Sequence, residues 1–72
     1  MILLSSLPIG KSAVIKELLP GCPHRLSELG FNPGERVEPV YASPLGLPRA
    51  YLVLGGIVAL RKQDSDMVIV EE

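Results

Sequence analysis

The chain has 72 residues, which allows one domain, and 47% of them are hydrophobic. Its formal net charge of -1 argues against nucleic-acid binding, which requires a basic face. The single cysteine, Cys22, excludes an internal disulfide and fits a reducing, cytoplasmic setting. The longest apolar run, Tyr51 to Leu60, is split by two glycines and is too short for the roughly 20 apolar residues of a membrane-spanning helix.

The stretch Lys11 to Leu19 predicts a strand that follows a turn at Pro8-Ile9-Gly10. Ala13 and Ile15 are expected to face inward, with Lys16 and Glu17 near solvent. The alternation of apolar and polar residues slips once in this stretch, which predicts a bulge.

The stretch Pro23 to Leu29 predicts the one helix of the chain. Proline suits the first helical turn because its missing N–H would be unpaired there, and Gly30 suits the left-handed residue that ends many helices. A helix of about two turns must be held by packing. We expect two leucines of this helix and the phenylalanine that follows Gly30 to cap one end of a barrel: Leu26, Leu29 and Phe31.

The rest of the chain predicts short strands separated by close turns. Asn32-Pro33-Gly34 is typical of a turn, and Pro39 predicts an edge or a bulge in the strand that follows. A hairpin is expected at Gly55-Gly56. The expected strands are 35–42, 49–54, 57–62 and 67–70, with a loop at 44–48 and a polar turn at 63–66. About five short strands and one short helix predict a small all-β fold, a partly closed antiparallel β-barrel, over residues 1–72.

Four segments in order resemble the FeoA family of ferrous iron transport proteins. They cover nearly the whole chain, and one of them looks like the family's helix and turn, usually an Arg-Leu-x-x-Leu-Gly-Phe-x-Pro-Gly pattern. Each segment alone is a weak signal, and their order and spacing carry the resemblance. The matching segments are Leu7-Pro8-Ile9-Gly10, Arg25 to Gly34, Ser43-Pro44-Leu45-Gly46, and Ala59-Leu60-Arg61-Lys62 with the closing Met67 to Val70.

The resemblance implies an SH3-like fold and a cytoplasmic, non-enzymatic role. It implies a partner, the cytoplasmic part of a membrane ferrous iron transporter with a GTPase domain (FeoB-type), and it implies no cofactor. Met1 lies where the domain should begin, so we expect a free-standing protein without membrane insertion. An exposed apolar patch would also fit a homo-oligomer.

The loop from Pro44 to Pro48 is the best candidate for partner binding, because two leucines in a turn-rich stretch are difficult to bury together. The alternative is that both leucines fold back over the end of the barrel. Where the family often has an acidic residue, this chain has Leu47, and its next strand is more apolar than usual. The predicted partner-binding residues are Arg25, Leu45, Gly46, Leu47 and Tyr51.

Three polar groups have competing interpretations. Arg25 is a partner contact, a plain surface residue, or the partner of Glu28 in a helical ion pair. Cys22 and His24 supply metal-ligand chemistry, but a closed site needs four ligands, so an incidental pair is the simpler interpretation. Asp64 and Asp66 are expected to be solvated turn residues.

Two other functions compete with the transport role. A generic SH3-like module would bind proline-rich peptides through clustered aromatic side chains, and this chain has two tyrosines and no tryptophan. A transition-metal sensor would depend on Cys22 and His24. The sequence shows no catalytic constellation. His24 is the only histidine that could activate a serine or Cys22, and a nucleophile–histidine pair also needs a third group to orient it.

Overall fold

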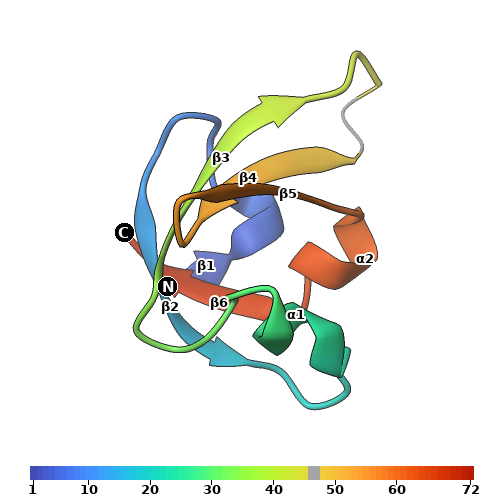
Figure 1. The fold of residues 1–72 in the computed structure, drawn as a ribbon. Helices are drawn as coiled ribbons and strands as arrows, with labels where there is room; N and C mark the ends of the chain where they lie inside the picture. The colour runs from blue at the N-terminus through green and yellow to red at the C-terminus, as the bar shows by residue number, and fades with distance from the viewer. Residues whose placement is uncertain (46–47) are drawn as a thin grey trace.

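The computed structural model describes residues 1–45 and 48–72, and within them six antiparallel strands form one curved sheet (Figure 1). The sheet order is β1-β6-β2-β3-β4-β5, so β1 and β5 are unpaired edges and the sheet wraps around a core without closing. The strands are β1 (Ile2–Leu3), β2 (Ala13–Leu18), β3 (Arg36–Ala42), β4 (Arg49–Val53), β5 (Gly56–Leu60) and β6 (Val68–Glu71). The predicted small, partly closed, all-β architecture is confirmed.

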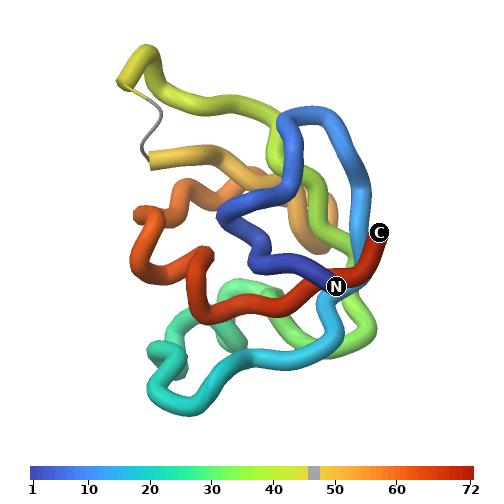
Figure 2. The backbone as a smooth tube through the Cα atoms, turned by 180° about the vertical axis from the view of Figure 1, so that it is seen from behind, coloured from blue at the N-terminus to red at the C-terminus, as the bar shows by residue number. Residues whose placement is uncertain are grey.

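The strand absent from the predicted set is β1. It has two residues, too few to show any alternation, and it exists because Ile2 pairs with Val70 and Leu3 with Ile69 of β6. This pairing brings the two chain termini side by side (Figure 2).

Both predicted irregularities in the strands are confirmed. The register of β2 against β6 shifts between Ile15 and Glu17, and the register of β3 against β4 shifts between Pro39 and Tyr41. Because β3 lies between β2 and β4, its proline is accommodated by a bulge and not by an edge position.

The predicted helix is α1 (His24–Glu28), with Pro23 as its N-cap and Gly30 at a φ of 111° just beyond its end. The polar turn expected at 63–66 was wrong, because a second helix, α2 (Lys62–Ser65), occupies this segment. It is about one turn long and forms because the carbonyl of Arg61 accepts bonds from the N–H groups of Asp64 and Ser65. A 3₁₀ turn, η1 (Leu4–Ser6), follows β1.

The core is aliphatic around two aromatic rings, as the composition predicts. Phe31 and Tyr51 are fully buried and meet edge to face, with ring centroids 6.3 Å apart. Leu26 is buried as expected, but the expectation for Leu29 was wrong: it ends α1 and is 42% exposed. The other core residues are Leu4, Leu7, Ala13, Ile15, Val37, Val53, Leu60, Val68 and Val70.

The β4–β5 hairpin turns one residue earlier than the glycine pair predicts. Val53 pairs with Gly56, so the two central turn residues are Leu54 and Gly55, at φ values of 51° and 78°. Positive φ at both positions is the geometry of a type I′ turn, which usually takes Asn or Gly at its first position. Leu54 in this position is therefore strained.

Gly30 contacts the side chain of this strained leucine. A Cβ added to Gly30 would lie 2.7 Å from Leu54 Cδ1, whereas a Cβ added to Gly34, also at positive φ, would meet nothing within 4 Å. The backbone after α1 can therefore approach the hairpin only because residue 30 has no side chain.

We expect Gly30→Ala to destabilise the protein more than Gly34→Ala does. Each change imposes a backbone strain of about 1–2 kcal/mol, and only the first adds a clash. In a Leu54→Ala background the excess cost of Gly30→Ala should disappear, because the clashing atom is gone. Chemical denaturation of the four variants measures this coupling, and equal costs for Gly30→Ala in both backgrounds would contradict it.

A polar contact joins η1 to the end of α2. Ser5 Oγ donates a hydrogen bond to Asp66 Oδ1, and Lys62 Nζ lies 2.9 Å from Asp66 Oδ2. The Ser5 bond is the main cause, with Lys62 second, of a lowered pKa for the Asp66 carboxyl. The stability that Asp66 contributes is therefore present above its unfolded-state pKa and is lost as pH falls through its folded-state pKa.

Ser5→Ala should lower the melting temperature at neutral pH, because it removes the main contact to the Asp66 carboxylate. The difference from the parent protein should shrink as pH falls and Asp66 becomes protonated in both. Melting curves from neutral to strongly acidic pH measure this. A difference that stays constant across the range would show that the hydrogen bond does not act through the ionised carboxylate.

Candidate partner-binding surface

The loop between β3 and β4 carries the most exposed leucine among the described residues. Leu45 is 93% exposed, so it does not fold back over the end of the barrel, and Pro44 and Pro48 beside it are also exposed. Gly46 and Leu47, predicted with it as contact residues, lie outside the described residues. The contact role of this loop remains a prediction.

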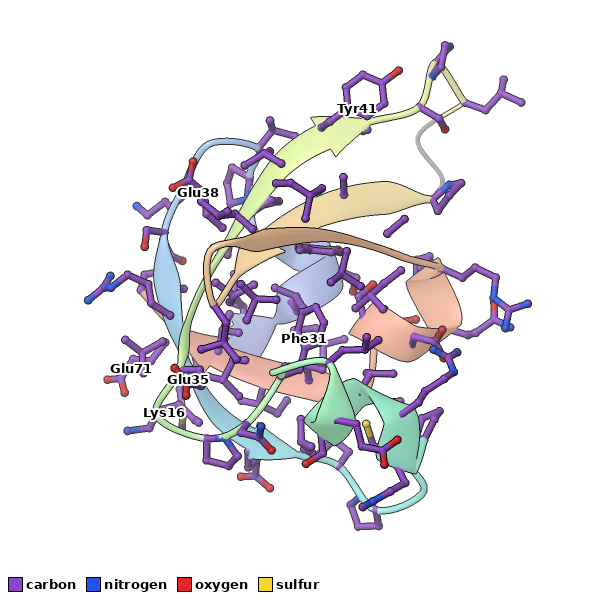
Figure 3. All side chains as sticks on the ribbon, viewed as in Figure 1. Lys16, Phe31, Glu35, Glu38, Tyr41 and Glu71 are labelled. Carbon is purple, nitrogen blue, oxygen red and sulfur yellow. The ribbon has the colours of Figure 1, made fainter. Side chains whose placement is uncertain are left out.

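Exposed apolar side chains gather on one part of the molecule. Among the described residues, nine large hydrophobic side chains are exposed, and six of them belong to β3, β4, β5 and their connections. In Figure 3, Tyr41 points away from the fold on the outer side of β3, whereas Phe31 points into its interior. We call these six residues the outer apolar face: Val40, Tyr41, Leu45, Leu52, Leu54 and Ile57.

A groove of about 300 Å³ lies beside this face. Its apolar wall comes from the end of β4 and the hairpin, through Leu52 and Leu54, and its polar wall from the start of β3, through Glu35, Arg36 and Glu38. Sequence reasoning missed this groove. The available signal was the apolar run of β4, in which the outward positions are as apolar as the inward ones.

Tyr51, predicted as a contact residue, is not on the surface. It is fully buried, because alternation along β4 turns Tyr51 and Val53 into the core when Leu52 faces out. Its hydroxyl accepts a hydrogen bond from Arg49 Nε at 3.1 Å, so the tyrosine belongs to the internal framework. The prediction that it meets a partner was wrong.

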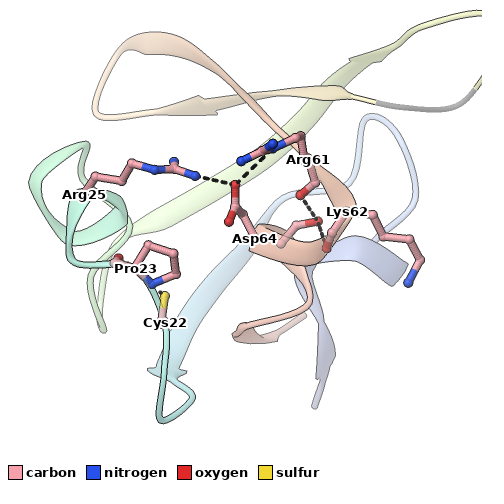
Figure 4. A network of polar contacts seen from close by, with 7 residues as sticks. Cys22, Pro23, Arg25, Arg61, Lys62 and Asp64 are labelled. Atoms are coloured by element: carbon pink, nitrogen blue, oxygen red, sulfur yellow. Dashed lines mark hydrogen bonds and ion pairs between the residues drawn. The ribbon is translucent and has the colours of Figure 1, made fainter.

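Arg25 is held inside the protein's own polar network (Figure 4). Its Nη2 lies 2.7 Å from Asp64 Oδ2, and Arg61 Nε lies 4.0 Å from the same oxygen. The predicted pairing with Glu28 was wrong, since His24 is the residue near Glu28, at 3.9 Å. The prediction of a solvated Asp64 was also wrong, because its side chain is only 7% exposed and joins α2 to α1.

Cys22 and His24 differ in their surroundings. The Cys22 side chain packs partly against the core, whereas the His24 side chain is 86% exposed. Burial raises the pKa of the Cys22 thiol, the Asp64 carboxylate raises it further, and Arg25 lowers it. A protonated thiol is a poor ligand and nucleophile at neutral pH. Within residues 1–45 and 48–72, no group of three His, Cys, Asp or Glu residues is placed to hold a metal ion.

A model of the FeoA domain family matches residues 2–72 of the chain. No curated protein sequence matches. Also within the described part of the chain, no helix has the length and hydrophobicity needed to cross a membrane.

Three solved structures illustrate the similarity. Iron(II) transport protein A from Clostridium thermocellum is 39% identical with a TM-score of 0.90; the match covers 97% of this chain and 44% of that one. FeoA of Stenotrophomonas maltophilia, described as a prokaryotic SH3 domain protein and solved with zinc, is 34% identical with a TM-score of 0.86, covering 99% and 91%. IdeR of T. acidophilum, at 18% identity and a TM-score of 0.79, covers 96% and 32% and shows the fold alone.

Arg25→Gln should destabilise the protein by about 1–3 kcal/mol, because it leaves the buried Asp64 carboxylate without its closest cation. Asp64→Asn removes the charge together with the ion pair and should cost less. Urea denaturation of the two variants and the parent measures the difference. A neutral effect of Arg25→Gln would contradict the structural role assigned to this arginine.

Proposed function

Because this chain belongs to the FeoA family, we propose that it is a cytoplasmic, non-enzymatic accessory protein of bacterial ferrous iron uptake. Its partner in this proposal is the cytoplasmic part of a membrane ferrous iron transporter with a GTPase domain, which it assembles or regulates. The whole domain, residues 1–72, serves as the binding module, with no cofactor.

The observation that carries the proposal is the exposed leucine of the β3–β4 loop within a whole-chain family match. Leu45 is 93% exposed and belongs to the outer apolar face. An apolar surface of this kind gains free energy when a partner removes it from water, at roughly 25 cal/mol per Å². A protein partner therefore suits this surface better than a small substrate.

The competing peptide-binding function has less support. A groove for proline-rich peptides depends on clustered exposed aromatic rings. Of the three aromatic residues, all described, Phe31 and Tyr51 are buried and Tyr41 alone is exposed. A role as a metal sensor would require ligands beyond Cys22 and His24.

We expect Leu45→Ser to leave the melting temperature almost unchanged, because so little of this side chain is buried in the monomer. Its affinity for the transporter's cytoplasmic domain should fall at least about fivefold, since the leucine no longer gains burial in the complex. Ile9→Ser is the matched control, an exposed aliphatic residue in another turn, 48% exposed. Calorimetric titration measures both.

Two other outcomes would count against the proposal. A parent protein that does not bind the transporter domain would reject the proposed partner. If Leu45→Ser and Ile9→Ser weaken binding equally, the proposed partner is kept and the loop is rejected as the contact site.

A further inference from the structure

One row of side chains crosses three strands on the outer side of the sheet. In the strand register, Glu38 of β3 lies opposite Leu52 of β4, and Leu52 lies opposite Ile57 of β5. Directly opposed residues have Cβ atoms about 4.5–5.5 Å apart. A carboxylate therefore stands at one end of a row whose other members are aliphatic, and Figure 3 shows Glu38 on the outer side of β3.

The two carboxylates of the groove have no cation of their own. Elsewhere in the described residues, Asp64, Asp66, Glu71 and Glu72 each pair with a lysine or arginine at 3.0 Å or less. Among residues 1–45 and 48–72, no ion pair forms at Glu35 or Glu38, and both are partly buried. Arg36 is the one cation among the described residues that line the groove, and its Nη1 donates to Ser12 Oγ at 3.0 Å. The groove keeps a net negative charge.

Leu54 completes the apolar wall at an energetic cost. It lies at a φ of 51° in a turn position that Asn or Gly would occupy without strain. Because Leu54 is 67% exposed, burial in the core returns little of that cost. Backbone strain that folding does not require is often found at binding sites.

We propose that this groove binds a partner segment that presents a lysine or arginine beside a large aliphatic or aromatic side chain. The apolar anchor packs on Leu52 and Leu54 while the cation meets Glu38, with Glu35 adding negative charge to the same groove. A lysine suits the row especially well, because its aliphatic stem lies along leucine while its ammonium reaches the carboxylate. The inference rests on the proposed function in so far as the segment belongs to the transporter.

The test is an NMR titration of the ¹⁵N-labelled full chain with a capped hexapeptide of the order Gly, Lys, Leu, Phe, Lys, Gly. Two control peptides replace both lysines by glutamate, or the leucine and phenylalanine by serine. We expect saturable shifts at the amides of residues 35–38 and 52–55 with the first peptide alone. The binding should weaken as ionic strength rises, because the charged pair is only partly buried.

Three variants locate the effect. Glu38→Gln should weaken hexapeptide binding about two- to fivefold, the range of a partly exposed ion pair. Glu17→Gln is the matched control and should change nothing. Glu17 is also a strand carboxylate, it forms no ion pair within the described part of the chain, and it lies outside the groove. Leu54→Asn should weaken binding without lowering the melting temperature, because asparagine suits the turn.

Equal binding of the lysine and glutamate peptides, or an unaltered affinity in Glu38→Gln, would overturn the inference. A parallel titration with the transporter's cytoplasmic domain separates the two proposals. If Leu45→Ser weakens binding of that domain and Glu38→Gln does not, this groove is rejected and the proposed function is kept. Hexapeptide binding at the groove with no binding of the domain would keep the groove and reject the transporter as its partner.

Discussion

The buried hydroxyl of Tyr51 sets the constraint on which the core depends. A hydroxyl at the centre of an aliphatic core is costly unless it has a hydrogen-bond partner. Arg49 supplies that partner, and its Nη2 also donates to the carbonyls of Leu4 and Leu7 at 3.2 and 2.8 Å. One guanidinium thus satisfies the core tyrosine and fixes the η1 segment against β4.

The short helix α1 must be held beside the open sheet by tertiary contacts. The backbone just beyond its C-terminal end approaches the β4–β5 hairpin, where Gly30 leaves room for Leu54. Near its other end, Arg25 reaches the buried carboxylate of Asp64 on α2. A helix of five residues has little stability of its own, so the ion pair of Arg25 with Asp64 and the burial of Leu26 hold it beside the sheet.

The surface of the molecule divides by chemistry. Lys16 on β2 forms an ion pair with Glu71, and Lys11 in the segment before β2 forms one with Glu72. These solvated ion pairs contribute little to stability. The outer side of β3, β4 and β5 is apolar instead and borders carboxylates without cations. A partner that supplies both apolar burial and positive charge would match this side, and the FeoA family's association with iron transport gives that surface a biological setting.

The sequence by itself determined the elements whose signals are local. The proline and glycine positions fixed the turns at 32–34 and the end of α1, a slip in alternation located the bulge of β2, and Pro39 marked the bulge of β3. Contacts between distant residues were decided only by the tertiary structure. Three features depend on a partner elsewhere in the chain: the two-residue strand β1, the burial of Asp64 beside Arg25, and the inward orientation of Tyr51. Strand alternation leaves open which set of residues faces the core, and in β4 both sets are apolar from Ala50 onward, so only the packing of the sheet could choose.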